Sequence, residues 1–197
     1  MKKLLVLLLL VAGGWFWWHE PAATWRGLPA AHEPLQVSTA LPAPFEHGDY
    51  TVTPLASYEI KAVVLSRKRY RYDAGSKLAP LDLALGWGPM SASTVINDLN
   101  ISQSGRWYEY SWSEEPPLDA DLISAHSANT HCLPSTSEIR RRLLAVRRHD
   151  IVTLKGHLVE VNGPKGYRWR SSLSRTDTRG GACEVMWITG IDVTRVK

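Results

Sequence analysis

The sequence predicts an α+β protein: a mainly antiparallel twisted sheet or small, partly closed barrel, with one clear packed helix at about residues 136–148. Apolar and polar residues alternate in several segments of the second half, as they do in half-buried strands. One segment has helical spacing behind a capping signal. Closely spaced turn residues join the last segments, which favours strands that follow one another in a sheet.

The 197-residue chain divides into three parts. Residues 1–18 predict a membrane anchor or signal segment, residues 19–48 a spacer rich in Pro and Ala, and residues 49–197 the globular α+β domain. The apolar run 4–18 reaches only about 22 Å as a helix, against a hydrocarbon core of about 30 Å. Its terminal tryptophans suit the headgroup level, and no small-residue cleavage site follows the run.

These features predict a signal-anchor, with a single transmembrane helix in the inner (cytoplasmic) membrane and the domain on the periplasmic side. The alternative is a protein that is secreted to the periplasm after signal cleavage. Both place the domain in the cell envelope.

The first half of the domain has fewer regular signals. Alternation predicts a strand at residues 58–65, which the basic run 67–72 would continue toward a sheet edge. Residues 80–85 are expected to form a short helical turn, and residues 91–99 a short helix in this middle segment. Alternating aromatic residues predict a strand at 106–112.

The second half begins with the clearest helix. Ser135 and Glu138 fit a capping box, and Ile139, Leu143 and Val146 follow at helical spacing. Strands are predicted at 151–161, 167–173 and 184–193.

The stretch 126–134 joins an acidic segment to a basic one and is expected to be a loop. From residue 73 to 121 there are two Lys or Arg against eight Asp or Glu; from 136 to 197 there are thirteen against six. Either the two segments attract each other within the fold, or the basic one presents a face for an anionic partner.

Candidate catalytic residues in this stretch are His126, Asn129 and His131, with roles that the sequence does not specify. A metal site would have to use His126, His131, Cys132 and Cys183, but two histidines five residues apart do not share a helix or strand face. The alternative for the cysteines is a disulfide bond, Cys132–Cys183. No cofactor is expected. The histidines and Asn129 could instead hydrogen-bond loop backbone.

A ligand-binding face has more support. Arg168 and Arg170 flank Trp169 on a predicted strand, and Arg175 and Arg179 follow in the next loop. Guanidinium groups in this pattern suit carboxylate or phosphate. The alternative is a solvated strand face that pairs with the acidic segment.

Four stretches carry a resemblance: DLALGWGPM (82–90), ISQSGRWY (101–108), HSANTH (126–131) and WRSSLSRTDT (169–178). Through them the chain resembles an uncharacterised family of small bacterial membrane-anchored or exported proteins. The resemblance covers most of the chain after residue 49. It implies no activity, ligand or catalytic residue.

The sequence therefore predicts an envelope protein whose domain acts as a binding or assembly module of unknown molecular function. Whether it is an enzyme stays open, and the alternative is an envelope hydrolase, with or without a metal, centred on His126 and His131. Expected partners are the membrane through residues 4–18, and an anionic envelope component or acidic protein rather than nucleic acid. Neither a nucleophile-elbow serine nor a phosphate-binding loop is present in the sequence.

Overall fold

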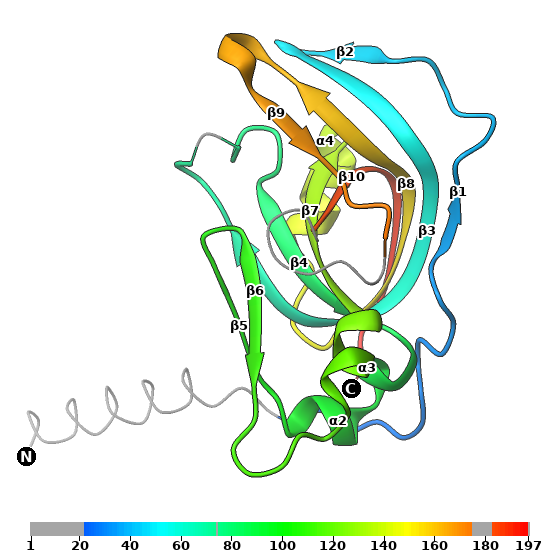
Figure 1. Ribbon diagram of the computed structural model, residues 1–197, viewed down its shortest axis with the longest axis vertical. Coiled ribbons are helices and arrows are strands. Elements are labelled where there is room, and N and C mark those ends of the chain that lie inside the picture. Colours follow the sequence, from blue (N-terminus) through cyan, green and yellow to red (C-terminus); the bar gives the residue numbers. More distant parts are fainter. Residues whose placement is uncertain (1–21, 74, 175–182, 197) are drawn as a thin grey trace, which may run out of the picture.

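The computed structural model describes residues 22–73, 75–174 and 183–196, which form a mainly β protein (Figure 1). Its strands are β1 (Leu35–Val37), β2 (Phe45–His47), β3 (Tyr50–Arg69), β4 (Leu81–Gly86), β5 (Asn100–Ser104), β6 (Trp107–Ser111), β7 (Ser127–Pro134), β8 (Ile151–Asn162), β9 (Arg168–Arg170) and β10 (Glu184–Thr194). Its helical elements are η1 (Gly88–Ser91), α2 (Ser93–Asn97), α3 (Ala120–Ala125), α4 (Ser137–Leu144) and η2 (Pro164–Gly166).

The predicted α+β class is therefore wrong. The α-helices of the described residues have five, six and eight residues, and none is a long packed helix. The expected helix at 136–148 is only α4, because the helix ends at Leu144 with Ala145 as its C-cap and the following residues lead into β8. Its N-cap is Thr136, whose hydroxyl accepts a hydrogen bond from the backbone N–H of Ile139 (3.2 Å).

Five strands form a closed ring. β3 pairs with β4, β4 with β7, β7 with β10, β10 with β8, and β8 again with β3. Within this ring only the β7–β10 pair is parallel. In chain order the barrel strands are connected as 1-2-3-5-4-1, with α4 between the third and the fourth. This is the topology of an OB-fold, a five-stranded Greek-key barrel.

Closure depends on β3, which is 20 residues long and pairs with β8 along one part and with β4 along the other. Register shifts near Pro54 and Val64 mark irregularities that bend the strand. On β8, which pairs with both β3 and β10, a Cβ added at Gly156 would lie 1.9 Å from the carbonyl oxygen of Trp187 on β10. Glycine at this position lets β8 and β10 approach closely enough to close the ring.

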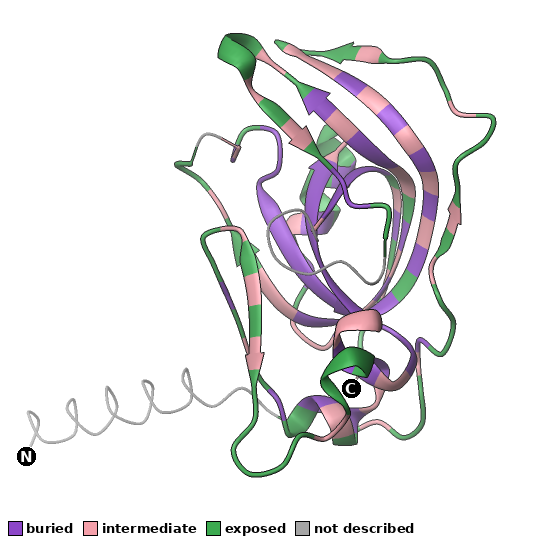
Figure 2. Ribbon diagram, in the orientation of Figure 1, coloured by how far each residue is buried: buried purple, intermediate pink, exposed green. Residues whose placement is uncertain are grey.

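The barrel interior is apolar. Alternate residues of β3, β4, β7, β8 and β10 belong to one buried cluster, to which α4 adds Ile139 and Leu143. Figure 2 shows buried and partly exposed residues in alternating bands along β3, whereas β4 is buried throughout. Leu81, Leu83 and Leu85 from β4 have no exposed surface. Burial of each such side chain contributes about 1.5–3 kcal/mol.

Two segments differ from their predicted conformation. Residues 80–85 were expected to be helical but form β4, in which all six residues are buried. The outward-facing residues of β4 are covered as well, so the sequence lacks the polar alternation of a half-exposed strand. The expected loop 126–134 is mostly β7. Its seven residues from Ser127 to Leu133 are likewise buried on both faces, and this hid the strand from the sequence analysis.

Residues 22–48 lie along the barrel. β1 pairs with residues 57–59 of β3, and β2 with residues 50–52. Trp25 donates its indole N–H to the carbonyl of Ser91, and Trp87 donates to the Glu33 carboxylate. These contacts hold the segment against the domain.

The predicted transmembrane anchor requires correction. In the described ranges, no helix combines the length and the apolar character that crossing a bilayer requires. The single-pass inner-membrane localisation and the signal-anchor are therefore not supported. Residues 1–18, on which both predictions rested, lie outside the described residues. Their calculated reach of about 22 Å was already shorter than the hydrocarbon core.

Candidate functional site: a cleft over β4 and β7

A cleft of about 440 Å³ lies on the outer face of the barrel. Its lining comes from four places: the loop after β3 (Asp73, Gly75), the β5–β6 turn (Arg106, Trp107), the strand β7 (His131), and the segment around β9 (residues 167–170) with Cys183. The volume is within the range of small-ligand sites. The fold thus brings together residues that are distant in the sequence.

The β5–β6 turn places Arg106 in the cleft. Ser104 pairs with Trp107, which leaves Gly105 and Arg106 as a two-residue turn with φ of 55° and 71°. A type I′ hairpin turn requires positive φ at both positions. For Arg106 this conformation costs about 1–2 kcal/mol. Hydrogen bonds offset the cost: its N–H donates to the Tyr70 hydroxyl (3.0 Å), and its carbonyl accepts from Asn129 (3.0 Å).

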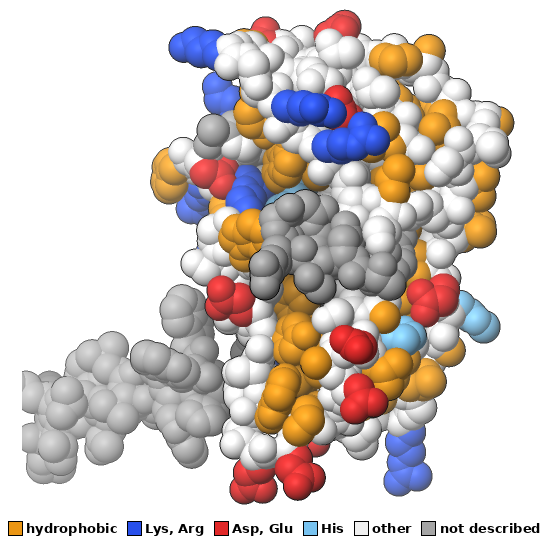
Figure 3. Space-filling view, in the orientation of Figure 1, with side chains coloured by type: hydrophobic (Ala, Val, Ile, Leu, Met, Phe, Trp, Pro, Cys, Tyr) orange, Lys and Arg blue, Asp and Glu red, His pale blue; other side chains and the backbone are white. Residues whose placement is uncertain are grey.

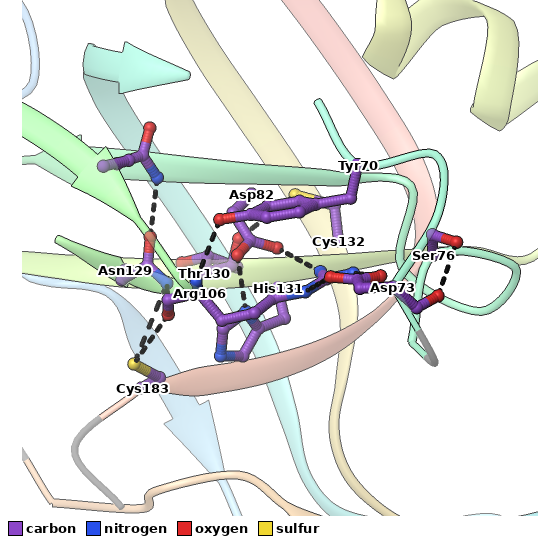
Figure 4. Close-up of polar contacts among 11 residues, drawn as sticks. Tyr70, Asp73, Ser76, Asp82, Arg106, Asn129, Thr130, His131, Cys132 and Cys183 are labelled. Atoms are coloured by element: carbon purple, nitrogen blue, oxygen red, sulfur yellow. Dashed lines mark hydrogen bonds and ion pairs between the residues drawn. The ribbon is translucent and has the colours of Figure 1, made fainter. Parts of the chain in front are cut away.

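The Arg106 guanidinium joins two carboxylates (Figure 4). It donates two hydrogen bonds to Asp73 and one to Asp82, each 2.8 Å long. Its carbon atom Cζ lies 3.8 Å from the centre of the Tyr70 ring. Burial lowers the pKa of Arg106, but the hydrogen bonds to Asp73 and the charges of Asp82 and Asp73 outweigh it, so the pKa is raised. Arg106 is therefore a fixed cation that holds the cleft floor together.

His131 lies beside this network. Its Nδ1 lies 3.0 Å from Oδ2 of Asp82, and both atoms are buried without a hydrogen-bond partner among the described residues. The Trp169 ring packs over the imidazole, with ring centroids 4.5 Å apart. His131 is one side chain of the cleft wall, with 4% of its side chain exposed.

Arg168 and Arg170, here called the β9 arginines, are exposed at the rim of the cleft, as their alternation predicted. Both donate to the same oxygen of Glu160, Arg168 over 3.0 Å. These two hydrogen bonds and one from Asn162 lower the pKa of Glu160 to about 2. Within the described ranges, one carboxylate thus faces two guanidinium groups, which leaves one positive charge and several N–H donors unmatched there. Arg175 and Arg179 lie outside the described residues.

The remaining predicted site residues do not assemble into one centre. His126 contacts Glu33 (3.2 Å) and the carbonyl of Leu122, at the opposite end of β7 from His131, and does not line the cleft. Asn129 holds the β5–β6 hairpin on β7 through Gln103 and Arg106. Within the described ranges, no three metal-ligating side chains come together.

Cys132 and Cys183 do not form a disulfide with each other, since one belongs to the core cluster of the barrel and the other lines the cleft. Cys132 belongs to the barrel interior, where burial and the nearby charge of Asp82 raise the pKa of its thiol. A nucleophile needs the thiolate, so Cys132 is a packing residue. Cys183 is half-buried at the cleft wall, with Sγ 3.8 Å from Nδ2 of Asn129.

Sequence reasoning missed the charged residues Asp73, Arg106 and their partner Asp82, as well as Glu160 behind the β9 arginines. It also did not assign the lining aromatics Trp107 and Tyr167 to a site. The available signal was Arg106, one of only two cations in the acidic segment, in a Gly-Arg dipeptide before an alternating run. Recognising that dipeptide as a hairpin turn would have placed a cation between two strands. Its carboxylate partners lie 24 and 33 residues away and cannot be assigned without the barrel.

Comparisons with known proteins identify no relative: no family model, no curated protein and no solved structure matches this chain. The resemblance to an uncharacterised bacterial family stays a prediction. Any function has to be argued from the cleft itself.

Proposed function

We propose that this protein is a binding module that holds an anionic ligand, an acidic saccharide, in the cleft over β4 and β7. One observation carries the proposal. Among the described residues, the β9 arginines share a single carboxylate at the cleft rim, which leaves charge and donors of their guanidinium groups unmatched beside an aromatic wall. Guanidinium groups bind carboxylates in a planar, two-point geometry.

The place of the cleft supports this proposal. In OB-fold barrels, oligonucleotides and oligosaccharides bind over the second and third strands and the loops that follow strands one and four. The corresponding elements here are β4, β7, the loop 70–80 and the segment 163–174.

The chemistry of the lining favours a ring with a carboxylate. Trp169 and Tyr167 offer apolar surface for a sugar ring, and burial raises the pKa of Tyr167 to about 12, so its hydroxyl stays neutral. Asp73 and Asp82 are already neutralised in part by Arg106. Among the described residues of the rim, the charge left unmatched is therefore positive, which selects an anionic group.

The test is isothermal titration calorimetry with three probes: a trimer of galacturonate, the neutral trimer maltotriose and a single-stranded trinucleotide. We expect the acidic trimer to bind and maltotriose to bind at least about tenfold more weakly, which corresponds to about 1.4 kcal/mol. Replacement of both β9 arginines by Ala should abolish the difference. Arg140→Ala with Arg147→Ala removes two exposed arginines outside the cleft and is the matched control.

Glu160→Gln separates a binding role from a structural one. Because Glu160 competes with an anionic ligand for the same two guanidinium groups, the variant should bind the acidic trimer more tightly. Equal affinity for all three probes, or tighter binding of the trinucleotide, would contradict the proposal.

A further inference from the structure

Among the described residues, no carboxylate of the acidic segment 73–121 forms an ion pair with a Lys or Arg of the basic segment 136–197. The two ion-paired carboxylates of the acidic segment, Asp73 and Asp82, contact Arg106 and His131. Five others between residues 107 and 121 are exposed and have no ion pair among the described residues: Glu109, Glu114, Glu115, Asp119 and Asp121. This surface is left with a strong local negative charge.

An aromatic ladder runs through the same surface. Tyr108, Tyr110 and Trp112 lie along one side of β6 and the residue after it, with ring centroids 5.7 Å apart in the first pair and 6.4 Å in the second. The Tyr110 and Trp112 rings are stacked at 25°. Trp112 is 36% exposed. Tyr108 and Tyr110 are half-buried, so the platform consists of the exposed Trp112 ring and the accessible parts of the two tyrosine rings.

The platform is rigid before any partner arrives. The Tyr108 hydroxyl hydrogen-bonds Ser127 of β7 (3.0 Å), and the Tyr110 hydroxyl hydrogen-bonds Ser124 of α3 (3.2 Å). Burial raises the pKa of Tyr108, which keeps the phenol neutral. Ring orientation is therefore fixed by the fold, which reduces the entropy that binding would cost.

Figure 3 shows this surface from outside: hydrophobic side chains form a column over β6 and α3, with acidic side chains on both sides and at its lower end. The carboxylates and the ring faces attract the same kind of group. A guanidinium or ammonium over a Tyr or Trp face gains about 0.5–1 kcal/mol at an exposed site. Carboxylates within a Debye length of about 10 Å add to that attraction.

We propose that this acidic aromatic face, formed by Tyr108, Tyr110, Trp112 and the carboxylates of Glu114, Glu115, Asp119 and Asp121, docks an extended, arginine-rich segment of a partner protein. Alternate side chains of such a segment repeat every 6–7 Å or so, which matches the spacing of the ladder. The charge of the face excludes nucleic acid and acidic saccharides. The site is separate from the cleft, and it does not depend on the function proposed for the cleft.

The experiment uses the full chain and two eight-residue peptides, (Gly-Arg)₄ and (Gly-citrulline)₄, of equal size but different charge. We expect the arginine peptide to bind and the citrulline peptide to bind at least about tenfold more weakly at low ionic strength. Trp112→Ala should weaken binding of the arginine peptide by about two- to fivefold, and Trp112→Phe should restore part of it. Replacement of Glu114, Glu115, Asp119 and Asp121 by their amides should weaken it by about tenfold or more.

Two controls separate peptide docking on this face from changes elsewhere in the protein. Arg168→Ala changes the cleft and should leave peptide affinity unchanged. The replaced side chains are exposed, and far-ultraviolet circular dichroism checks that each variant folds. Equal affinity for the two peptides, or full affinity in both the Trp112→Ala and the amide variants, would overturn the proposal. Self-association of the wild type that both variants abolish would also overturn it, since a second copy would then be the occupant.

Discussion

Nη1 of Arg106 lies 2.8 Å from Oδ1 of Asp82, a carboxylate whose side chain has no exposed surface. The contact joins the tip of the β5–β6 hairpin to the second strand of the barrel. It gives the buried charge of Asp82 a partner, and it holds the left-handed turn residue in place. The floor of the cleft depends on this pair.

Replacement of Arg106 by Ala should therefore destabilise the protein. Breaking a buried ion pair leaves an uncompensated charge at Asp82, and we expect the free energy of unfolding to fall by about 3–5 kcal/mol. Urea denaturation followed by tryptophan fluorescence measures it. The exposed pair of Arg141 with Glu138 provides the control: Arg141→Ala should cost no more than about 1 kcal/mol. A similar small loss for both variants would contradict this role of Arg106.

Glu160 should titrate far below an ordinary glutamate. Hydrogen bonds from the β9 arginines and Asn162 lower its folded-state pKa to about 2, compared with an ordinary value of 4.5. A lowered folded pKa stabilises the protein fully above the unfolded pKa, and this contribution is lost as the pH falls from about 4.5 to about 2. Carboxyl-carbon NMR of the wild type and of the Arg168→Ala, Arg170→Ala variant measures the pKa. An unchanged pKa in that variant would rule out the arginines as the cause.

The two thiols should differ in reactivity. Cys132 is fully buried and its pKa is raised, whereas Cys183 is half-buried at the cleft wall. We expect Ellman's reagent to modify one thiol in the folded protein and two after unfolding without reductant. Cys183→Ser should remove the reaction of the folded state. Absence of any free thiol in the unfolded, unreduced protein would instead indicate the Cys132–Cys183 disulfide.

Gly156→Ala should be among the most destabilising single-methyl additions in the barrel. The new Cβ would lie 1.9 Å from the Trp187 carbonyl oxygen, which is backbone and cannot rotate away. We expect a loss of about 3 kcal/mol, measured as a lower midpoint of urea unfolding. Gly190→Ala on β10 is the matched control, because its Cβ would meet only Lys155 at an ordinary 3.5 Å. Equal stability of the two variants would show that β8 and β10 have room to separate.

Local signals in the sequence located several elements closely. Alternation placed β8 and β10 nearly to their observed ends, and the segment of β9 was found with its exposed arginines. α4 begins where its capping signal stands, although the cap is Thr136 rather than Ser135. These features depend on neighbours within a few residues, which is the range over which a pattern carries information.

The strands β4 and β7 could not be recognised in this way. Both are buried on two faces, one toward the barrel interior and one under the β5–β6 hairpin and the cleft residues. Polar residues on their outer faces, Asp82 and Asn129, are buried through partners that are distant in the sequence. Their pattern therefore resembles neither a half-exposed strand nor an apolar run.

The sequence by itself determined the alternating strands of the last third, the capped helix and the arginine pair at Arg168 and Arg170. Only the tertiary structure decided that the strands close into a barrel, because closure depends on one long strand, β3, that pairs on both of its edges. It also decided that His126 and His131 lie apart and that Arg106 holds Asp73 and Asp82. Charges that are dozens of residues apart meet only when the ring of strands has brought their backbones together.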